Sequence, residues 1–353
     1  MTSTIFTKLP VWLSARDELP HAAVDMPFWV ENYLTYAFSS QNSVGIYLHF
    51  RHVPGQQGKP DLWDELVQIS LPGDRYLTSR AFGPGHISRN SDIDGVGRFG
   101  VCGLSYECHE PFARWTKRFV GGARLVAGDE LRAGPVADGP HVPVELELNI
   151  SGWGAPFDYG TSSLEQAWGK AHYEQHHRIA GHLLVDGERF DLEGTGLRDH
   201  SWGPRQFERM GRTTWIHASF PDSGRAFALC YVAETPPHVP ERLLWTVVHQ
   251  GADGAEVIPV EVPDVPEATK LVHVDEDTEF HLRMPDGRIS TIRTSLVAPL
   301  RMYLMRGSEI GHGSPHPGGP HPHATHHYCP TFVTVDWDGE QGFGYNERSV
   351  ELI

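Results

Sequence analysis

The sequence predicts a mostly β protein built from antiparallel sandwiches or barrels, with few short helices. Apolar and polar residues alternate with a period of two along much of the chain, and Asp-Gly pairs recur between the alternating segments. The 37 Gly and 27 Pro among 353 residues indicate many turns and argue against a helix bundle. At roughly 150 residues per domain, a chain of this length is expected to form about two domains.

The alternation is clearest in two segments. Val44, Ile46, Leu48 and Phe50 share one face of a predicted strand, and residues 144–151 alternate between aliphatic and polar side chains in the same way. Asp-Gly suits the positive φ angles of tight hairpins, so the spacing indicates an antiparallel meander. The further predicted strands are 65–71, 177–185, 190–194, 213–220, 226–233, 243–249, 256–262, 271–275, 278–283, 290–297 and 331–337. The best helix candidate is 163–173.

Glycine-rich stretches predict where the chain divides. A Gly/Ser-rich stretch over 151–163 precedes a fresh series of hairpins, which places the domain boundary near residue 170. The predicted domains are therefore 1–170 and 171–353. Within the second, residues 307–327 are rich in His, Pro and Gly and have no apolar face, so a long loop is expected there.

The net charge, the hydropathy and the cysteine content restrict the expected classes of binding partner and the expected location. The formal net charge is −16 and no basic patch occurs, which argues against nucleic acid or an anionic membrane as the main partner. No run reaches the 18 apolar residues that a membrane span requires, and Met1–Asp17 lacks a signal-peptide core. The four cysteines form no CxxC pair, so a reduced cytoplasmic setting is expected. A Cys102–Cys108 disulfide is conceivable, but small buried hydrophobes are the simpler interpretation.

The densest cluster of chemically active groups lies in the segment GTGLRDHSWGPR. In an extended strand, Arg198, His200 and Trp202 face one way while Asp199 and Ser201 face the other. Such groups are costly to bury unless they satisfy one another. The segment is therefore either a functional site or a salt-bridged corner in which Asp199 has a structural role.

Two familiar catalytic arrangements are not predicted. A Ser-His-Asp triad needs side chains that converge from separate elements, whereas these three residues are consecutive and no G-x-S-x-G elbow occurs. No G-x-G-x-x-G fingerprint or βαβ pattern is present for a dinucleotide. The expectation is a protein that uses no cofactor.

The string EQHHRIAGHLLVDGERFDLEGTGLRDHSWGPR resembles the signature of the carotenoid 1,2-hydratase (hydroxyneurosporene synthase) and AttH-like superfamily, in its bacterial two-domain branch. PFWVEN at 27–32, YECHEPFARW at 106–115 and GFGYNERS at 342–349 support the resemblance. The resemblance implies two lipocalin-like β-barrels with a largely apolar cavity. It also implies hydration of an isolated alkene in a terpenoid without a cofactor; other relatives cyclise, isomerise or only carry lipids.

The resemblance carries over to few residues. His200 and Trp202 match the His and Trp of the family's HSW motif, which are implicated in hydratase activity. Tyr231 matches a downstream Tyr, but Ala233 stands where the family has an Asp two residues later. That departure puts carotenoid hydration itself in doubt. Another acid would have to serve, and the candidates are Glu174, Asp199 and Glu31.

The chemistry of alkene protonation assigns roles to further residues. It needs a carboxyl that an apolar pocket keeps protonated, aromatic faces that stabilise a cation, and a polar group that places water or removes a proton. The expected catalytic residues are His200, Trp202, Asp199, Glu174 and Tyr231. The expected substrate-contacting residues, in a cavity between the domains, are Arg198, Trp215, His217, Gln175 and Glu31. Ordinary core packing is the competing interpretation for Trp215.

The leading hypothesis is thus a cofactor-independent lyase or isomerase acting on an apolar terpenoid, steroid-like or aromatic molecule. One alternative is a lipocalin-like carrier that leaves its ligand unchanged. Another is a metal-dependent enzyme, because three imidazoles with an open position suit zinc or iron. The candidate ligands cluster at His172, His176, His177 and His182, but their spacing matches no standard site, so no metal is assigned. The oligomeric state stays open, with a homodimer as one option.

Overall fold

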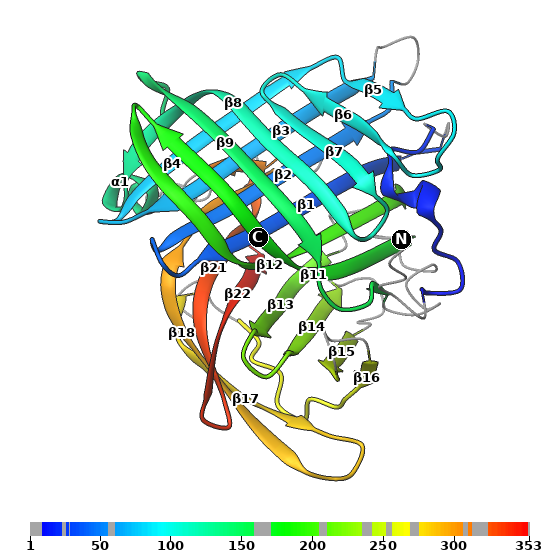
Figure 1. The fold of residues 1–353 in the computed structure, drawn as a ribbon. Coiled ribbons are helices and arrows are strands. Elements are labelled where there is room, and N and C mark those ends of the chain that lie inside the picture. Colours follow the sequence, from blue (N-terminus) through cyan, green and yellow to red (C-terminus); the bar gives the residue numbers. More distant parts are fainter. Residues whose placement is uncertain are drawn as a thin grey trace. The chain divides into compact units, whose positions relative to one another are not determined.

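The computed structural model of the protein describes residues 9–22, 26–27, 29–55, 61–158, 171–204, 210–234, 242–251, 256–268, 275–305, 310–312 and 324–351. Antiparallel strands dominate these residues, and the helical elements are only η1 (Ala15–Glu18) and α1 (Gly128–Ala133) (Figure 1). The predicted mostly β fold class is confirmed. Among the described helices, none has the length and apolar character that crossing a bilayer requires.

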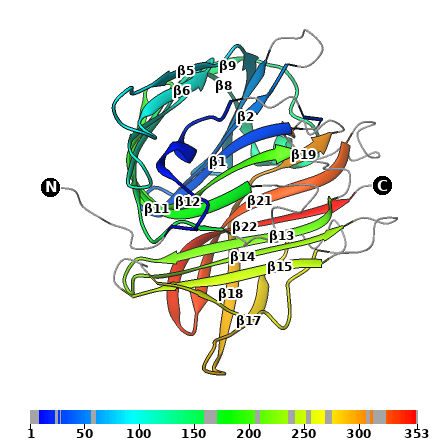
Figure 2. The same ribbon diagram turned by 90° about the vertical axis from the view of Figure 1, so that its right-hand side faces the viewer.

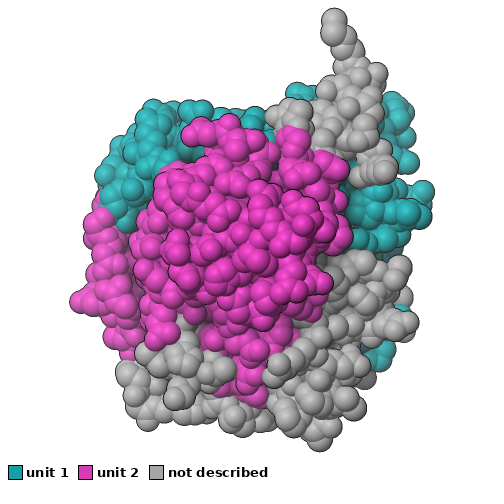
Figure 3. All heavy atoms as spheres, turned by 90° about the horizontal axis from the view of Figure 1, so that it is seen from below, with its two compact units in different colours: residues 1–72, 77–125, 139–205 teal, residues 73–76, 126–138, 206–353 magenta. Residues whose placement is uncertain are grey.

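The chain forms two compact units, coloured separately in Figure 3. Unit 1 comprises residues 1–72, 77–125 and 139–205, and unit 2 comprises residues 73–76, 126–138 and 206–353. The predicted boundary near residue 170 lies inside unit 1. The reason is strand pairing, because β11 (Ala171–Val185) and β12 (Glu188–Pro204) pair with β9 (His141–Gly152) and β1 (Trp29–Ser39) of the same unit.

The sheet of unit 1 closes on itself. Pairing runs in the order β11, β12, β1, β2, β3, β4, β8 and β9, and β9 returns to β11. The remaining bounds in this ring are β2 (Val44–Val53), β3 (Leu62–Leu71), β4 (Arg75–Gly83) and β8 (Arg114–Ala127). A second branch from β8 carries β7 (Leu104–Glu110), β6 (Gly97–Val101) and β5 (His86–Arg89), and β10 (Phe157–Asp158) pairs with β11. The ring turns one side chain in two inward.

The predicted alternation of 44–51 and 144–151 is confirmed in β2 and β9. Ile46, Leu48 and Phe50 are fully buried in the core of unit 1, where they join Leu146 and Leu148. The predicted helix over 163–173 lies outside the described residues except at 171–173, which begin β11 instead.

Unit 2 contains an open antiparallel sheet in the order β16, β15, β14, β13, β22, β21, β18 and β17 (Figure 2). The bounds are β13 (Met210–Phe220), β14 (Arg225–Glu234), β15 (Arg242–Gln250), β16 (Glu256–Pro259), β17 (Thr278–Arg283), β18 (Ile289–Pro299), β19 (Met302–Met305), β20 (Ile310–His312), β21 (Ala324–Trp337) and β22 (Glu340–Glu351).

The expected loop over 307–327 is wrong at both ends. Residues 310–312 form β20, which pairs with β19, and residues 324–327 begin β21, which pairs with β19 and β22. The prediction took a missing apolar face as a sign of a loop. Backbone hydrogen bonds to neighbouring strands nevertheless hold these segments in the sheet. Residues 306–309 and 313–323 lie outside the described part of the chain.

Two local predictions have clear outcomes. The Asp186-Gly187 and Asp338-Gly339 pairs both adopt positive φ angles at the hairpins between β11 and β12 and between β21 and β22. Cys102 is exposed, Cys108 is buried, and neither forms a disulfide.

Candidate acid–base site

The pleat of β12 distributes the RDHSWG residues as the sequence predicts. Arg198 lies opposite Gln175 of β11, and His200 lies opposite both Tyr173 of β11 and Tyr33 of β1. Tyr33 belongs to the core of unit 1, so this face of β12 points into the ring of strands. Asp199 points to the opposite face, where it lies across from Glu174. One short motif therefore contributes to two separate polar clusters.

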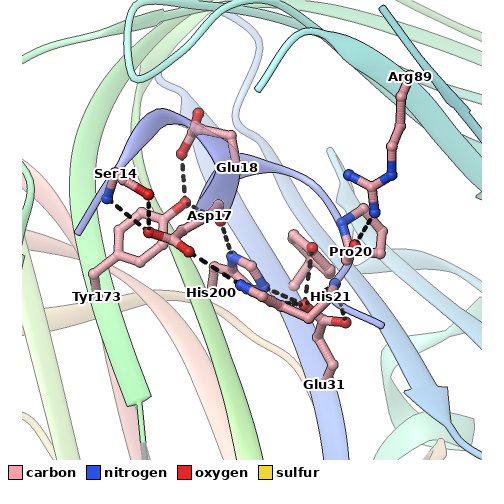
Figure 4. A network of polar contacts seen from close by, with 10 residues as sticks. Ser14, Asp17, Glu18, Pro20, His21, Glu31, Arg89, Tyr173 and His200 are labelled. Atoms are coloured by element: carbon pink, nitrogen blue, oxygen red, sulfur yellow. Dashed lines mark hydrogen bonds and ion pairs between the residues drawn. The ribbon is translucent and has the colours of Figure 1, made fainter. Parts of the chain in front are cut away.

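Glu31 is the centre of the inner cluster (Figure 4). This residue of β1 is fully buried, and its Oε1 lies 2.8 Å from His200 Nε2 and 2.7 Å from His21 Nδ1. The backbone N–H of His21 donates to Oε2 at 3.0 Å, and the Tyr33 hydroxyl donates to Oε1 at 3.2 Å. Burial opposes ionisation, but hydrogen bonds from His200 and His21 lower the pKa of Glu31. The lowered pKa makes Glu31 a carboxylate and not the protonated acid that alkene protonation would require of it.

His21 carries a positive charge at neutral pH. Its Nδ1 faces Glu31 and its Nε2 lies 3.1 Å from Asp17 Oδ1. Asp17 is held in turn by the Ser14 backbone N–H and hydroxyl, at 2.6 and 2.7 Å. Although burial acts against the charged form, the hydrogen bonds with Asp17 and Glu31 raise the pKa of His21 to about 9. Sequence reasoning missed Asp17 and His21.

His200 sits between two hydrogen-bond acceptors. Its Nδ1 lies 2.7 Å from the backbone carbonyl oxygen of Asp17, and its Nε2 lies 2.8 Å from Glu31 Oε1. A carbonyl oxygen can only accept, so Nδ1 donates, and a hydrogen bond between Nε2 and the Glu31 carboxylate requires a second proton on the imidazole. Burial and the charge on His21 lower the pKa of His200, against the effect of Glu31. A proton at Nε2 is therefore released more readily than from an ordinary imidazolium.

Aromatic rings flank this proton. Tyr33 stacks on His200 at 3.9 Å between ring centroids, and Trp202 lies 4.7 Å from His200 and 4.1 Å from His21. Trp12 packs edge-on against Trp202, with 5.7 Å between the ring centroids. Trp202 and His21 are only half-buried, so they form the part of the cluster nearest to solvent.

Arg198 and Gln175 are committed to the protein's own groups. Arg198 donates to Glu18 Oε1 at 2.9 Å and to Gln175 Oε1 at 2.6 Å. Gln175 donates in turn to the backbone oxygens of Phe112 and Gly154. The carboxylate that pairs with Arg198 belongs to Glu18 of η1, which the sequence did not single out.

The outer cluster consists of His172, Glu174 and Asp199. His172 Nε2 lies 2.5 Å from Asp199 Oδ2 and 3.2 Å from Glu174 Oε1. Burial acts against the charged imidazole, but the two carboxylates raise the pKa of His172 to about 9. Glu174 and Asp199, two of the candidate acids, thus meet the imidazolium of His172, which the sequence offers only as a candidate metal ligand.

Both clusters offer three ligand atoms within 4.8 Å of one another, so each could hold a metal ion. The set of His21, Glu31 and His200 has the two imidazoles and one carboxylate that suit iron or zinc. The four-histidine cluster does not form as a unit, because His177 points to the opposite face of β11 from His172, His176 and His182.

The expected residues of unit 2 divide between the faces of its sheet. The rings of Trp215 and His217 lie 4.6 Å apart, and Trp215 also contacts Tyr345 at 5.6 Å. Tyr231 belongs to the core on the other face, as does Ala233, and its hydroxyl donates to Glu267 Oε1 at 2.8 Å. Trp215 and Tyr231 therefore do not form one aromatic wall.

A carboxyl with the pKa of an acid catalyst lies elsewhere in unit 1. Burial raises the pKa of Glu65 on β3 to about 7, and its Oε2 accepts a hydrogen bond from the Leu104 backbone N–H at 2.6 Å. Sequence reasoning missed Glu65, because its carboxyl is buried only by folding and nothing in its local pattern distinguishes it from a solvated acid.

His172 makes stability depend on pH. Its raised pKa stabilises the folded state fully below the unfolded value near 6.5, and this contribution disappears as pH rises through about 9. We expect the difference in unfolding free energy between wild type and His172→Gln to shrink by about 3 kcal/mol from pH 6 to pH 10. Urea unfolding across this range measures it, with His182→Gln on the same strand as the control. A difference that stays constant with pH would contradict the assignment.

Comparison with known proteins places the chain in a family. Residues 14–349 match DUF7064, a domain of unknown function. The chain belongs to this family. The DUF7064 match spans both polar clusters and both units. A search among curated proteins found no match.

Solved structures share the fold. An AttH-type protein from Nitrosomonas europaea aligns with a TM-score of 0.58 at 14% identity, covering 94% of this chain and 98% of that one. CghA aligns with a TM-score of 0.58 at 13% identity, covering 95% of each chain. Kievitone hydratase from Nectria haematococca aligns with a TM-score of 0.51 at 10% identity, covering 92% of this chain and 88% of that one. The AttH-like fold that the motif resemblance implied is thereby confirmed for this DUF7064 member.

Proposed function

We propose that this protein is a cofactor-independent enzyme of the lyase or isomerase type, which hydrates, dehydrates, cyclises or shifts a double bond in an apolar small molecule. The observation that carries the proposal is the buried 2.8 Å contact between His200 Nε2 and Glu31 Oε1, beside the ring of Trp202. A terpenoid, steroid-like or aromatic substrate fits this setting, because aromatic faces stabilise the carbocation that alkene protonation creates.

In the proposed mechanism, His200 donates a proton to the alkene, and the Glu31 carboxylate stabilises the His200 imidazolium before the transfer. Burial and the charge on His21 make the His200 imidazolium a stronger acid than an ordinary one. After transfer, neutral His200 keeps its Nδ1–H on the Asp17 carbonyl, so the ring stays oriented. Its Nε2 is then free to remove a proton from water or from the adjacent carbon of the cation, which gives hydration or isomerisation respectively.

The shared fold is consistent with this proposal. Kievitone hydratase is by its name a hydratase, and CghA has also been solved with the compound Sch210972. A fold hosts many functions, so the proposal rests on the His200–Glu31 pair and uses the fold only as background.

The decisive experiment looks for chemistry on the carbon skeleton. Full-length protein is incubated in D₂O with a panel of apolar alkenes and their tertiary alcohols, and products are followed by mass spectrometry. We expect the gain or loss of water, or deuterium on carbon, for at least one compound, and a loss of about 100-fold or more in His200→Gln. His182→Gln should react like wild type, and elemental analysis of untagged protein monitors metal content.

A carrier is the second candidate. It is favoured by Ala233, which stands where the carotenoid hydratases have an Asp, and by Arg198 and Gln175, whose side chains hydrogen-bond to each other. A carrier would bind panel members stoichiometrically and return them unchanged from D₂O. That result, in protein that melts cooperatively, would replace the enzyme proposal.

A further inference from the structure

Lys117 is a buried amine inside unit 1. The chain has five lysines, and Lys117 on β8 is the only one within the described residues. It is 3% exposed and lies opposite Tyr106 of β7 in the strand register. Tyr106 belongs to the core of unit 1, so the Lys117 side chain points into the ring of strands.

The amine has an unusual set of neighbours. Its Nζ contacts the Thr35 hydroxyl of β1, lies 4.0 Å from the centre of the Tyr106 ring and lies 5.9 Å from that of Trp115. Among the residues that the structure describes, no carboxylate lies within ion-pair distance of Nζ. A buried ammonium normally requires such a partner.

The surrounding charges favour the neutral amine. Burial and the guanidinium of Arg198 lower the pKa of Lys117 well below its usual range, while Glu18 and Asp199 act in the opposite direction. A lysine that is desolvated and close to another cation is activated as a nucleophile. Lys117 therefore has the electrostatic setting of a reactive amine.

His177 provides a proton carrier in the same interior. It is fully buried on β11, its side chain lies over Gly196, and neither ring nitrogen has a hydrogen-bond partner among the described residues. Burial and the charges of Lys117 and Arg198 lower its pKa, so the ring is neutral and has one donor and one acceptor. Buried polar atoms without a partner call for an explanation, and a polar group of a bound ligand would supply partners for both nitrogens.

We propose that Lys117 condenses with the carbonyl group of an aldehyde or ketone ligand inside unit 1, with His177 moving the protons. This proposal is independent of the chemistry assigned to His200. Its ligand class, a small apolar carbonyl compound, follows from the aromatic rings beside Nζ and the spare donor and acceptor of His177.

The proposed step conserves atoms and charge. The Lys117 nitrogen lone pair forms a bond to the carbonyl carbon as the C=O π pair moves onto oxygen; His177 then takes one proton from the nitrogen and gives one to the oxygen, which yields a carbinolamine and leaves His177 neutral. In the second half, the nitrogen lone pair forms the C=N bond as the C–O bond breaks, His177 gives its proton to the departing hydroxyl group to form water, and the last proton on the nitrogen passes to His177, which is again neutral. No oxidant, reductant or metal takes part.

Reductive trapping tests the proposal. Full-length protein is incubated with hexanal or cinnamaldehyde and sodium cyanoborohydride at pH 7, and adducts are mapped on digested peptides. Trapping at Lys117 should be about tenfold or more faster than at Lys8, Lys59, Lys170 and Lys270, because each unit by which the pKa falls raises the neutral fraction tenfold. Adducts spread evenly over the lysines, confined to those four, or absent would overturn the proposal.

Variants separate reactivity from folding. Lys117→Met keeps the length of the side chain and should lose the adduct. His177→Gln should slow trapping at Lys117 and change its dependence on pH between 6 and 9, a readout that a purely structural histidine would not move. His182→Gln is the matched control on β11. If Lys117→Met does not fold, peptide mapping of wild type and His177→Gln still decides the matter.

Discussion

Glu18→Ala is expected to destabilise the protein by about 3–5 kcal/mol, because it leaves a buried guanidinium without its carboxylate. Glu18 is fully buried and bonds to Arg198 at 2.9 Å, the Phe112 backbone N–H at 2.9 Å and Trp115 Nε1 at 2.7 Å, and the Tyr173 hydroxyl also donates to it. All four donors are buried and lose their acceptor together. Urea unfolding followed by tryptophan fluorescence measures the change.

Two comparisons isolate the buried charge. Asp191→Asn disrupts an exposed ion pair with Arg189 and should change stability by less than about 0.5 kcal/mol. Glu18→Gln combined with Arg198→Met removes both charges and should cost less than Glu18→Ala alone, since no uncompensated ion is left. If Glu18→Ala were as stable as wild type, Arg198 would have found another partner and the prediction would be wrong.

Glu31→Gln is expected to lower turnover by about 100- to 10,000-fold, the range for loss of a proton-transfer group. The amide keeps the shape of the side chain but cannot hold the proton shared with His200 or neutralise His21. The substitution therefore removes the carboxylate that stabilises a proton on His200 Nε2. The reaction found in the D₂O panel, run at several pH values, gives the measurement.

The control for Glu31→Gln is Glu188→Gln, an exposed carboxylate on the same strand as His200. It should leave turnover and its pH profile unchanged. Undiminished turnover in Glu31→Gln would rule out the His200–Glu31 pair as the proton donor, whatever the effect on stability.

The local sequence pattern correctly predicted which side chains share a face within a single strand. Alternation identified β2 and β9, and it correctly separated Arg198, His200 and Trp202 from Asp199. These outcomes follow from the two-residue period of a strand, which any short stretch of sequence contains.

The partners of those residues were not predictable in the same way. Asp17, Glu18 and His21 reach His200 and Arg198 from about 180 positions earlier in the chain. The one local signal was the Ser14-x-x-Asp17 spacing of a capping box at η1, next to Glu18 and close to His21. It marks a turn but says nothing of which strand the turn contacts.

By itself, the sequence determined that this is a β protein and which side chains of the RDHSWG strand share a face. Only the tertiary structure decided that Glu31 is a carboxylate between two imidazoles, that Tyr231 and Trp215 lie on opposite faces, and that Lys117 is buried with no carboxylate of the described residues within ion-pair distance. Strand register between distant segments sets these contacts, and burial then sets the charges. Both are properties of the closed sheet, and no single strand encodes them.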